Sequence, residues 1–216
     1  MRKILVGLII LTGFIYIFFI PEEPIGLKIA LKLVPMMLII LYGVMTDSIV
    51  SPLYKRIIVA GLTVSMIADG VIYWFMAGLV TFFVAHILYI QAFRTERRKP
   101  VPLPVAVPLL LYGLFMVFWI AWPQIAKGEV ILGAAIVAYI LIILIMGWEA
   151  VRTRMPLAIT GALLFICSDS FLAIDRFVTP LPAREALVMI TYYAAQIFIA
   201  ASICSKKRVR KQGGLC

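Results

Sequence analysis

Long apolar runs, separated by short connectors rich in proline and charge, make up most of this 216-residue chain. Several runs reach about 18–20 residues, the length that an α-helix needs to cross a hydrocarbon layer of about 30 Å. The alternation of apolar and polar residues that a transmembrane β-barrel would show is absent from the sequence. The pattern therefore predicts an all-α polytopic membrane protein.

Eight transmembrane helices are expected, because proline marks most of the boundaries between the apolar runs. Residues 57–93 carry no charge except Asp69, yet a single helix of that extent would be about 55 Å long. We therefore expect a hairpin within this stretch, near Met76–Gly78. The predicted spans are about 4–20, 27–45, 55–75, 77–94, 103–122, 129–148, 156–174 and 185–204.

The composition agrees with a membrane protein and separates the chain from soluble globular domains. Hydrophobic residues make up 64% of it, charged residues only 14%, and the mean hydropathy is +1.11. The formal net charge of +10 would suit a nucleic-acid partner, but the basic residues lie in short connectors and in a terminal tail. We therefore predict contact with anionic lipid and no nucleic-acid partner.

The distribution of basic residues also predicts the orientation. With the N-terminus inside, fifteen of the 20 Lys and Arg residues fall in inner segments and four in outer segments. The positive-inside rule then makes both termini cytoplasmic, with 206–216 as a basic cytoplasmic tail. The expected location is the inner (plasma) membrane of a bacterium.

A weak internal repeat divides the single transmembrane domain, 1–205, into two halves. Gly61–Asp69 and Gly161–Asp169 each begin with Gly and end with Asp, one hundred positions apart. Phe82–Leu88 aligns with Tyr192–Phe198, where aromatic pairs precede a polar residue. We predict two parallel four-helix repeats, about 1–100 and 101–205, although chance similarity between apolar helices is the alternative. Repeats of this kind commonly place a functional site at their interface.

Asp69 and Asp169 are the strongest candidates for chemistry. A carboxylate at the centre of a membrane helix costs about 2.5–3.5 kcal/mol on insertion scales. Both lie about 8–9 Å below the same predicted boundary, and Lys32 lies at a similar depth. Two carboxylates in one apolar site do not both ionise easily, so the pair can supply a general acid and a general base. The alternative is a structural role, with the carboxylates held by Lys32, Ser65 or Ser168.

The remaining polar candidates are aromatic, imidazole and amide side chains on the same side of the predicted bundle. His86 and Gln196 fall near the midplane, where either a packed core histidine or a site role is open. Tyr73 is either an interface aromatic or a platform for a cationic head group. His86 is the only histidine, which excludes a three-His zinc site, so no metal and no cofactor are expected.

Five stretches resemble the lysoplasmalogenase family of multi-pass membrane hydrolases (the TMEM86-like, YhhN group). They cover most of the chain in order. Members of that family often have Gly before the first Asp, where this chain has Ala68. They also often have Lys directly followed by Pro, whereas two residues separate Lys32 from Pro35 in this chain. The stretches are Lys32–Pro35, Gly61–Asp69, Gly78–Phe93, Gly161–Phe177 and Thr191–Ile199.

The resemblance implies hydrolysis of the vinyl-ether bond of an alkenyl lysophospholipid to a fatty aldehyde and glycerophospho-ethanolamine or -choline. Acid cleavage of a vinyl ether protonates its β-carbon, and water then captures the oxocarbenium ion. We expect Asp69 and Asp169 to form the catalytic pair. The supporting residues would be Lys32, Ser65, Tyr73, His86, Ser168, Tyr192 and Gln196.

Three other readings of the same residues stay open at this point. A proton-coupled transporter could use the carboxylates as a relay, and an intramembrane aspartyl protease would also use two Asp residues. The sequence lacks the Gly-x-Gly-Asp signature that is expected of such a protease. The third is a non-catalytic lipid-binding membrane protein. The sequence leaves open the head group, the chain length, the oligomeric state, which Asp is the acid and whether a plasmalogen is the physiological substrate.

Overall fold

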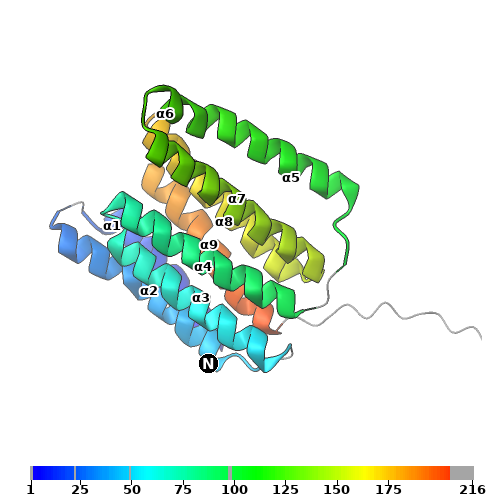
Figure 1. Cartoon of the computed structure of the whole chain (residues 1–216). Helices are drawn as coiled ribbons and strands as arrows, with labels where there is room; N and C mark the ends of the chain where they lie inside the picture. Colours follow the sequence, from blue (N-terminus) through cyan, green and yellow to red (C-terminus); the bar gives the residue numbers. More distant parts are fainter. Residues whose placement is uncertain (1, 22, 49, 97–98, 205–216) are drawn as a thin grey trace, which may run out of the picture.

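The computed structural model describes residues 2–204 except 22, 49, 97 and 98, and over this range it contains helices and no strands (Figure 1). One helix is interrupted by a π-helical segment, η1, and the last ends in a short 3-10 turn, Ser202–Cys204. The elements are α1 (Arg2–Phe19), α2 (Ile25–Met45), α3 (Pro52–Val71), α4 (Phe75–Thr95), α5 (Leu103–Met116), η1 (Val117–Ala121), α6 (Trp122–Ala126), α7 (Val130–Thr153), α8 (Pro156–Phe177) and α9 (Arg184–Ala201).

Seven of the helical segments are long and apolar enough to cross a membrane. They are α1, α2, α4, the continuous α5–η1–α6 segment, α7, α8 and α9. Helix α3 has a similar length of 20 residues but includes the charged residues Lys55, Arg56 and Asp69. The prediction of an all-α polytopic membrane protein with eight long helical segments is therefore confirmed.

Glycine permits the closest approaches between neighbouring helices. A Cβ on Gly61 of α3 would lie 2.5 Å from the Cε1 atom of Tyr89 on α4. A Cβ on Gly161 of α8 would lie 3.0 Å from two backbone atoms of α9, the Ala195 oxygen and the Ile199 nitrogen. Each glycine stands eight residues before one of the two candidate carboxylates. The two glycines therefore permit close packing at equivalent positions of the predicted repeat, of α3 on α4 and of α8 on α9. The division into two four-helix halves itself stays a prediction.

Both ends of the described chain lie at the same end of the bundle. Arg2 of α1 pairs with Asp47, which follows α2, and the Tyr54 hydroxyl near the start of α3 lies 2.6 Å from Ser202 Oγ beyond α9. The cytoplasmic placement of this end stays a prediction. The predicted basic tail, 206–216, lies outside the described residues.

Three predicted boundaries are wrong. The hairpin turn lies at residues 72–74 and not at Met76–Gly78, because Gly78 is a helical residue whose missing Cβ admits the Ile72 backbone: a Cβ there would lie 2.8 Å from Ile72 Cα. The fifth span does not end before Pro123, because proline is tolerated in the first turn of a helix and α6 continues to Ala126. Helix α7 extends past residue 148 to Thr153, where Glu149 pairs with Arg94 and Arg152.

The packing of α8 on α9 predicts that Gly161→Ala destabilises the protein. The added methyl group meets backbone atoms, which cannot rotate away, and overpacking of this kind costs about 1–3 kcal/mol. Gly7→Ala is the matched control, since a Cβ there meets nothing within 4 Å. Thermal unfolding in mild detergent should show a lower midpoint for Gly161→Ala only; equal midpoints for both variants would contradict this account of the interface.

Candidate functional site

A cavity of about 230 Å³ lies at the end of the bundle remote from the described termini. Its walls come from the end of α1, the start of α2, the end of α3 and the facing ends of α8 and α9, with Phe82 from α4. Both candidate carboxylates, Asp69 and Asp169, line it. Residues of the two predicted halves therefore meet in one chamber. The polar residues lining it are Tyr16, Lys28, Lys32, Asp69, Tyr73, Ser168, Asp169, Arg184, Glu185 and Tyr192.

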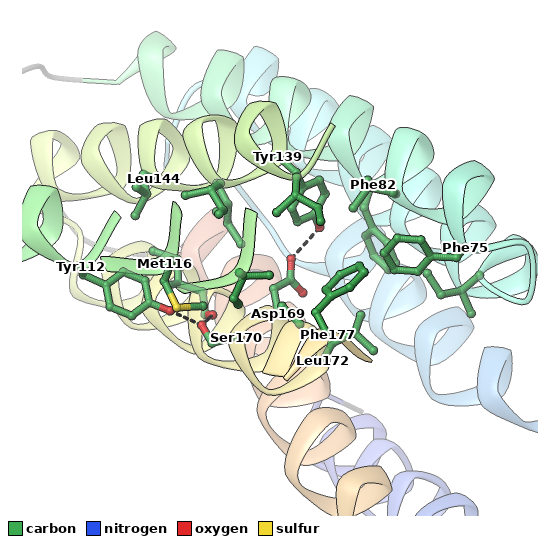
Figure 2. Close-up of a pocket in the computed structure, with 18 residues that line it drawn as sticks. Phe75, Phe82, Tyr112, Met116, Tyr139, Leu144, Asp169, Ser170, Leu172 and Phe177 are labelled. Carbon is green, nitrogen blue, oxygen red and sulfur yellow. Dashed lines mark hydrogen bonds between the residues drawn. The ribbon is translucent and has the colours of Figure 1, made fainter. Parts of the chain in front are cut away.

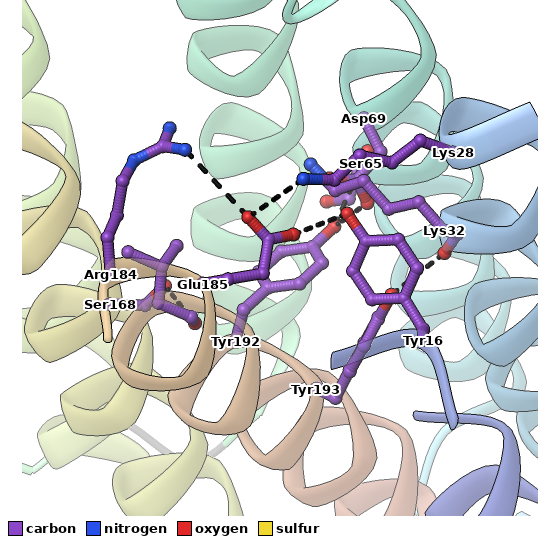
Figure 3. A network of polar contacts seen from close by, with 11 residues as sticks. Tyr16, Lys28, Lys32, Ser65, Asp69, Ser168, Arg184, Glu185, Tyr192 and Tyr193 are labelled. Atoms are coloured by element: carbon purple, nitrogen blue, oxygen red, sulfur yellow. Dashed lines mark hydrogen bonds and ion pairs between the residues drawn. The ribbon is translucent and has the colours of Figure 1, made fainter. Parts of the chain in front are cut away.

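Asp69 is held by a cation and a phenol. The side chain is only 2% exposed, and its Oδ1 atom lies 3.0 Å from the Lys32 ammonium nitrogen of α2. The Tyr192 hydroxyl of α9 donates a hydrogen bond of 2.5 Å to Oδ2 (Figure 3). Lys32 is fixed in turn from α9, since the Tyr193 hydroxyl donates to its backbone oxygen at 2.9 Å. A buried carboxylate with a hydrogen-bonded cation at this distance has its charge compensated.

Asp169 has different surroundings. The Tyr139 hydroxyl of α7 donates to its Oδ2 at 2.6 Å (Figure 2). Among the described residues, no Lys, Arg or His side chain lies within ion-pair distance of this carboxyl group. The two carboxyl groups thus share a cavity but differ in charge environment, because one has a cationic partner and the other a neutral one.

A second, apolar cavity of about 70 Å³ adjoins the first and lies between α4, α5, η1, α7 and α8. Ile72, Phe82, Asp169 and Leu172 line both cavities, so these residues form the boundary between them. Asp169 is the one ionisable group in that boundary. Apart from it, the polar residues that line the apolar cavity are Tyr112, Tyr139 and Ser170.

Charged residues gather around Glu185, at the start of α9. The Tyr16 hydroxyl donates to Glu185 Oε1 at 2.5 Å, while the Lys28 ammonium and an Arg184 guanidinium nitrogen lie 3.5 and 3.8 Å from Oε2 (Figure 3). Arg184 also pairs with Asp175 at 2.8 Å. Both cations line this first, polar cavity together with Glu185, so charged groups of both signs lie at its edge on the side of the α2 and α9 starts.

Neither serine contact of the structural alternative is present. Ser65 does not bond Asp69 within α3; its hydroxyl lies 3.2 Å from the Tyr89 hydroxyl, because that tyrosine reaches α3 across Gly61. Ser168 lines the cavity but donates to the Val188 backbone oxygen at 3.0 Å, and so joins α8 to α9.

His86 and Gln196 lie behind the cavity wall and not in it. Gln196 accepts a 2.7 Å hydrogen bond from Tyr89, and His86 Nδ1 lies 2.7 Å from the Phe82 backbone oxygen. The His86 ring stands edge-on to the Tyr139 ring at a centroid distance of 5.4 Å. Tyr73 differs from both: it is 66% exposed and forms part of the cavity rim.

Sequence reasoning missed Tyr139 and the cluster around Glu185. Tyr139 was visible as a lone hydroxyl-bearing residue in the otherwise apolar run of α7. No such signal marked Glu185 or Lys28, because charged residues near helix ends are normally solvated. Within the described part of the chain, no group of three or more His, Cys, Asp or Glu residues is placed to hold a metal ion.

Comparison with known proteins places the chain in a family. The profile of the YhhN family matches residues 27–203. Lysoplasmalogenase TMEM86A from Bos taurus is 38% identical over 170 residues, which are 70% of this chain and 66% of that protein. Lysoplasmalogenase TMEM86B from Rattus norvegicus is 30% identical over 206 residues, or 93% of this chain and 84% of that protein.

A bacterial relative, the lysoplasmalogenase of Mycobacterium tuberculosis, is 28% identical over 159 residues, which are 68% of this chain and 60% of that protein. The matched region therefore spans about two thirds of the bovine relative and less of the mycobacterial one. No solved structure matches the chain. The family profile and the relatives agree with each other, and the chain belongs to the YhhN family, which the sequence resemblance had indicated.

Proposed function

We propose that this protein is a lysoplasmalogenase-like hydrolase that cleaves the vinyl-ether bond of alkenyl lysophospholipids. The products are a fatty aldehyde and glycerophospho-ethanolamine or -choline. The names of the relatives support this class of reaction. The observation that carries the proposal is the position of Asp169 on the boundary between a polar and an apolar cavity.

The proposed substrate is likewise polar at one end and apolar at the other. A vinyl ether joins the polar glycerophosphate part of the lipid to its hydrocarbon chain, so the bond to be broken lies where a polar region meets an apolar one. With the phosphate toward Lys28 and Arg184 and the chain toward the apolar cavity, this bond lies beside Asp169. With cytoplasmic termini, the site occupies the outer half of the bacterial inner membrane that we propose as the protein's location.

The unequal surroundings of the two carboxyl groups support a different role for each. The Lys32 ammonium, 3.0 Å away, stabilises the negative charge of Asp69. Asp169 has no cationic partner among the described residues and borders the apolar cavity, and this burial favours its protonated form, although the hydrogen bond that Tyr139 donates favours the carboxylate. Asp169 is then the general acid, and Asp69 is the carboxylate that stabilises positive charge and orients water.

The reaction proceeds by proton transfer and addition of water. The Asp169 proton forms a C–H bond at the β-carbon with the electron pair of the double bond, which leaves an oxocarbenium ion. Water adds to the α-carbon and gives up a proton to a carboxylate, and the resulting hemiacetal collapses. The glycerol oxygen receives the proton that water gave to Asp69 and departs as the alcohol, the Asp169 carboxylate takes the hydroxyl proton of the hemiacetal, and the aldehyde remains. The overall stoichiometry consumes one water molecule and regenerates both carboxyl groups.

The choice of substrate tests the reaction class. Purified protein in detergent is incubated with alkenyl, alkyl and acyl lysophospholipids of matched head group and chain length, and aldehyde is measured by mass spectrometry. We expect aldehyde from the alkenyl lipid alone, because only a vinyl ether accepts a proton on carbon. Release of fatty acid from the acyl lipid would indicate a lysophospholipase, and binding without any product would indicate the lipid-binding alternative.

Removal of either acid tests the catalytic pair. Asp169→Asn and Asp69→Asn should each lower kcat by about 10²–10⁴-fold, the usual contribution of general acid–base catalysis. Asp47→Asn is the control, since Asp47 is 88% exposed and lies at the other end of the bundle. Wild-type rates in both site variants would exclude these residues from the reaction.

A double-mutant cycle tests whether Lys32 compensates the charge of Asp69. Lys32→Met leaves a buried carboxylate without its cation and should cost about 3–5 kcal/mol in the free energy of unfolding. In the Asp69→Asn background the same change should cost much less, because the partner is neutral. Denaturant titration of the four proteins gives the coupling energy, and strictly additive losses would show that the two side chains do not interact.

A further inference from the structure

We propose that the apolar cavity between α4, α5, η1, α7 and α8 binds the part of the substrate's hydrocarbon chain nearest the vinyl ether, and that Leu144 and its neighbour Gly113 limit how far along α7 the chain reaches. The inference rests on the proposed function for the identity of the lipid. It goes beyond that function by naming a binding site for the chain and the residues that limit it.

The cavity has the chemistry of a hydrocarbon site. Most of its lining residues are Ile, Leu, Met and Phe, and its polar groups are bonded to one another. The Tyr139 hydroxyl bonds Asp169, and Tyr112 on α5 bonds Ser170 on α8. Their hydrogen-bonding groups are thereby engaged, so the walls offer mainly carbon to whatever occupies the space. Apolar walls with a few polar groups fixed at one side are typical of lipid and small-molecule sites.

The position of the cavity indicates which kind of molecule can occupy it. It adjoins the polar cavity at Ile72, Phe82, Asp169 and Leu172, so a molecule that fills both must be polar at one end and apolar at the other. A single-chain amphiphile meets this requirement. Its first chain carbons, which include the vinyl-ether carbons, then lie beside Asp169.

Leu144 lies at the end of the cavity away from this boundary. Figure 2 shows Leu144, Tyr112 and Met116 on one side of Asp169, and Phe75 and Phe177 on the other. Leu144 follows Tyr139 by five residues on α7, which is about 7–8 Å along the helix. A chain that passes Asp169 and runs along α7 therefore meets the Leu144 side chain.

Gly113 of α5 controls the position of Leu144. A Cβ on Gly113 would lie 2.3 Å from Leu144 Cδ1 and 3.8 Å from its Cγ. Such a contact forces the flexible end of the leucine side chain to move, and because Leu144 lines the apolar cavity, part of the space open to it lies on the cavity side. A methyl group on α5 should therefore shorten the cavity without any change to a residue that lines it.

The π-helical segment η1 adds to this wall. Pro123 has no N–H group to donate to the Trp119 oxygen four residues earlier, and the Trp122 N–H group donates to the Val117 oxygen five residues earlier. The wider turn sets Ile120 against the cavity, and Met116 just before it lines the same wall. π-Helical turns of this kind recur at functional sites.

A chain-length series tests the inference. Alkenyl lysophospholipids with short, medium and long chains are compared as substrates of the wild type, Gly113→Ala and Leu144→Ala, with Gly7→Ala as the control. Gly113→Ala should lower kcat/KM for the longest chain by about fourfold for each methylene displaced, the equivalent of ~0.8 kcal/mol, and spare the shortest. Leu144→Ala should shift the preference toward longer chains, and Gly7→Ala should leave it unchanged.

Binding of alkyl-ether lysolipids, which lack the reactive double bond, separates this inference from the proposed function. Thermal stabilisation of the same four proteins by the alkyl series should show the same shifts in chain length. If the wild type releases no aldehyde but these shifts appear, the hydrolase proposal fails and the chain site stands. If Gly113→Ala and Leu144→Ala both keep the wild-type chain profile, the cavity holds only bulk membrane lipid or detergent and the inference is overturned.

Discussion

The structure depends on how two carboxyl groups are accommodated among apolar helices. Each needs partners that offset the loss of water. Asp69 has a cation from α2 and a phenol from α9, whereas Asp169 has a phenol from α7. Because these partners come from different helices, each contact also positions the helix that supplies it. The same contacts leave the two carboxyl groups in unequal charge environments, and this inequality is what a general acid and a carboxylate base require.

The two carboxyl groups also differ in which cavity they border. The acid with the neutral partner borders the apolar space, and the compensated carboxylate lies on the polar side with Lys28, Arg184 and Glu185 nearby. In the function that we propose, this arrangement orients an amphiphilic substrate by solvation, before any specific contact is made. On the same proposal, burial of the chain supplies binding energy and brings the bond at the polar–apolar junction to Asp169.

The helices and the two acids were predictable from the sequence, because span length, proline boundaries and an ionisable residue in an apolar run are local features. Lys32 was also predictable as a partner of Asp69 from its depth. The turn at residues 72–74 and the continuation past Pro123 were not, since they depend on the close approach of Gly78 to Ile72 and on a π-helical turn. Tyr139 and the Glu185 cluster could not be predicted, because tertiary packing decides which sides of the helices meet.

The most direct test of the unequal pair is the infrared spectrum of the protein near neutral pH. A protonated carboxyl group has a C=O stretching band that shifts in D₂O and is absent from a carboxylate. The account predicts that such a band is present in the wild type, is lost in Asp169→Asn and is retained in Asp69→Asn. A band that survives in Asp169→Asn and disappears in Asp69→Asn would reverse the roles, and its absence from the wild type would contradict a protonated acid at this site.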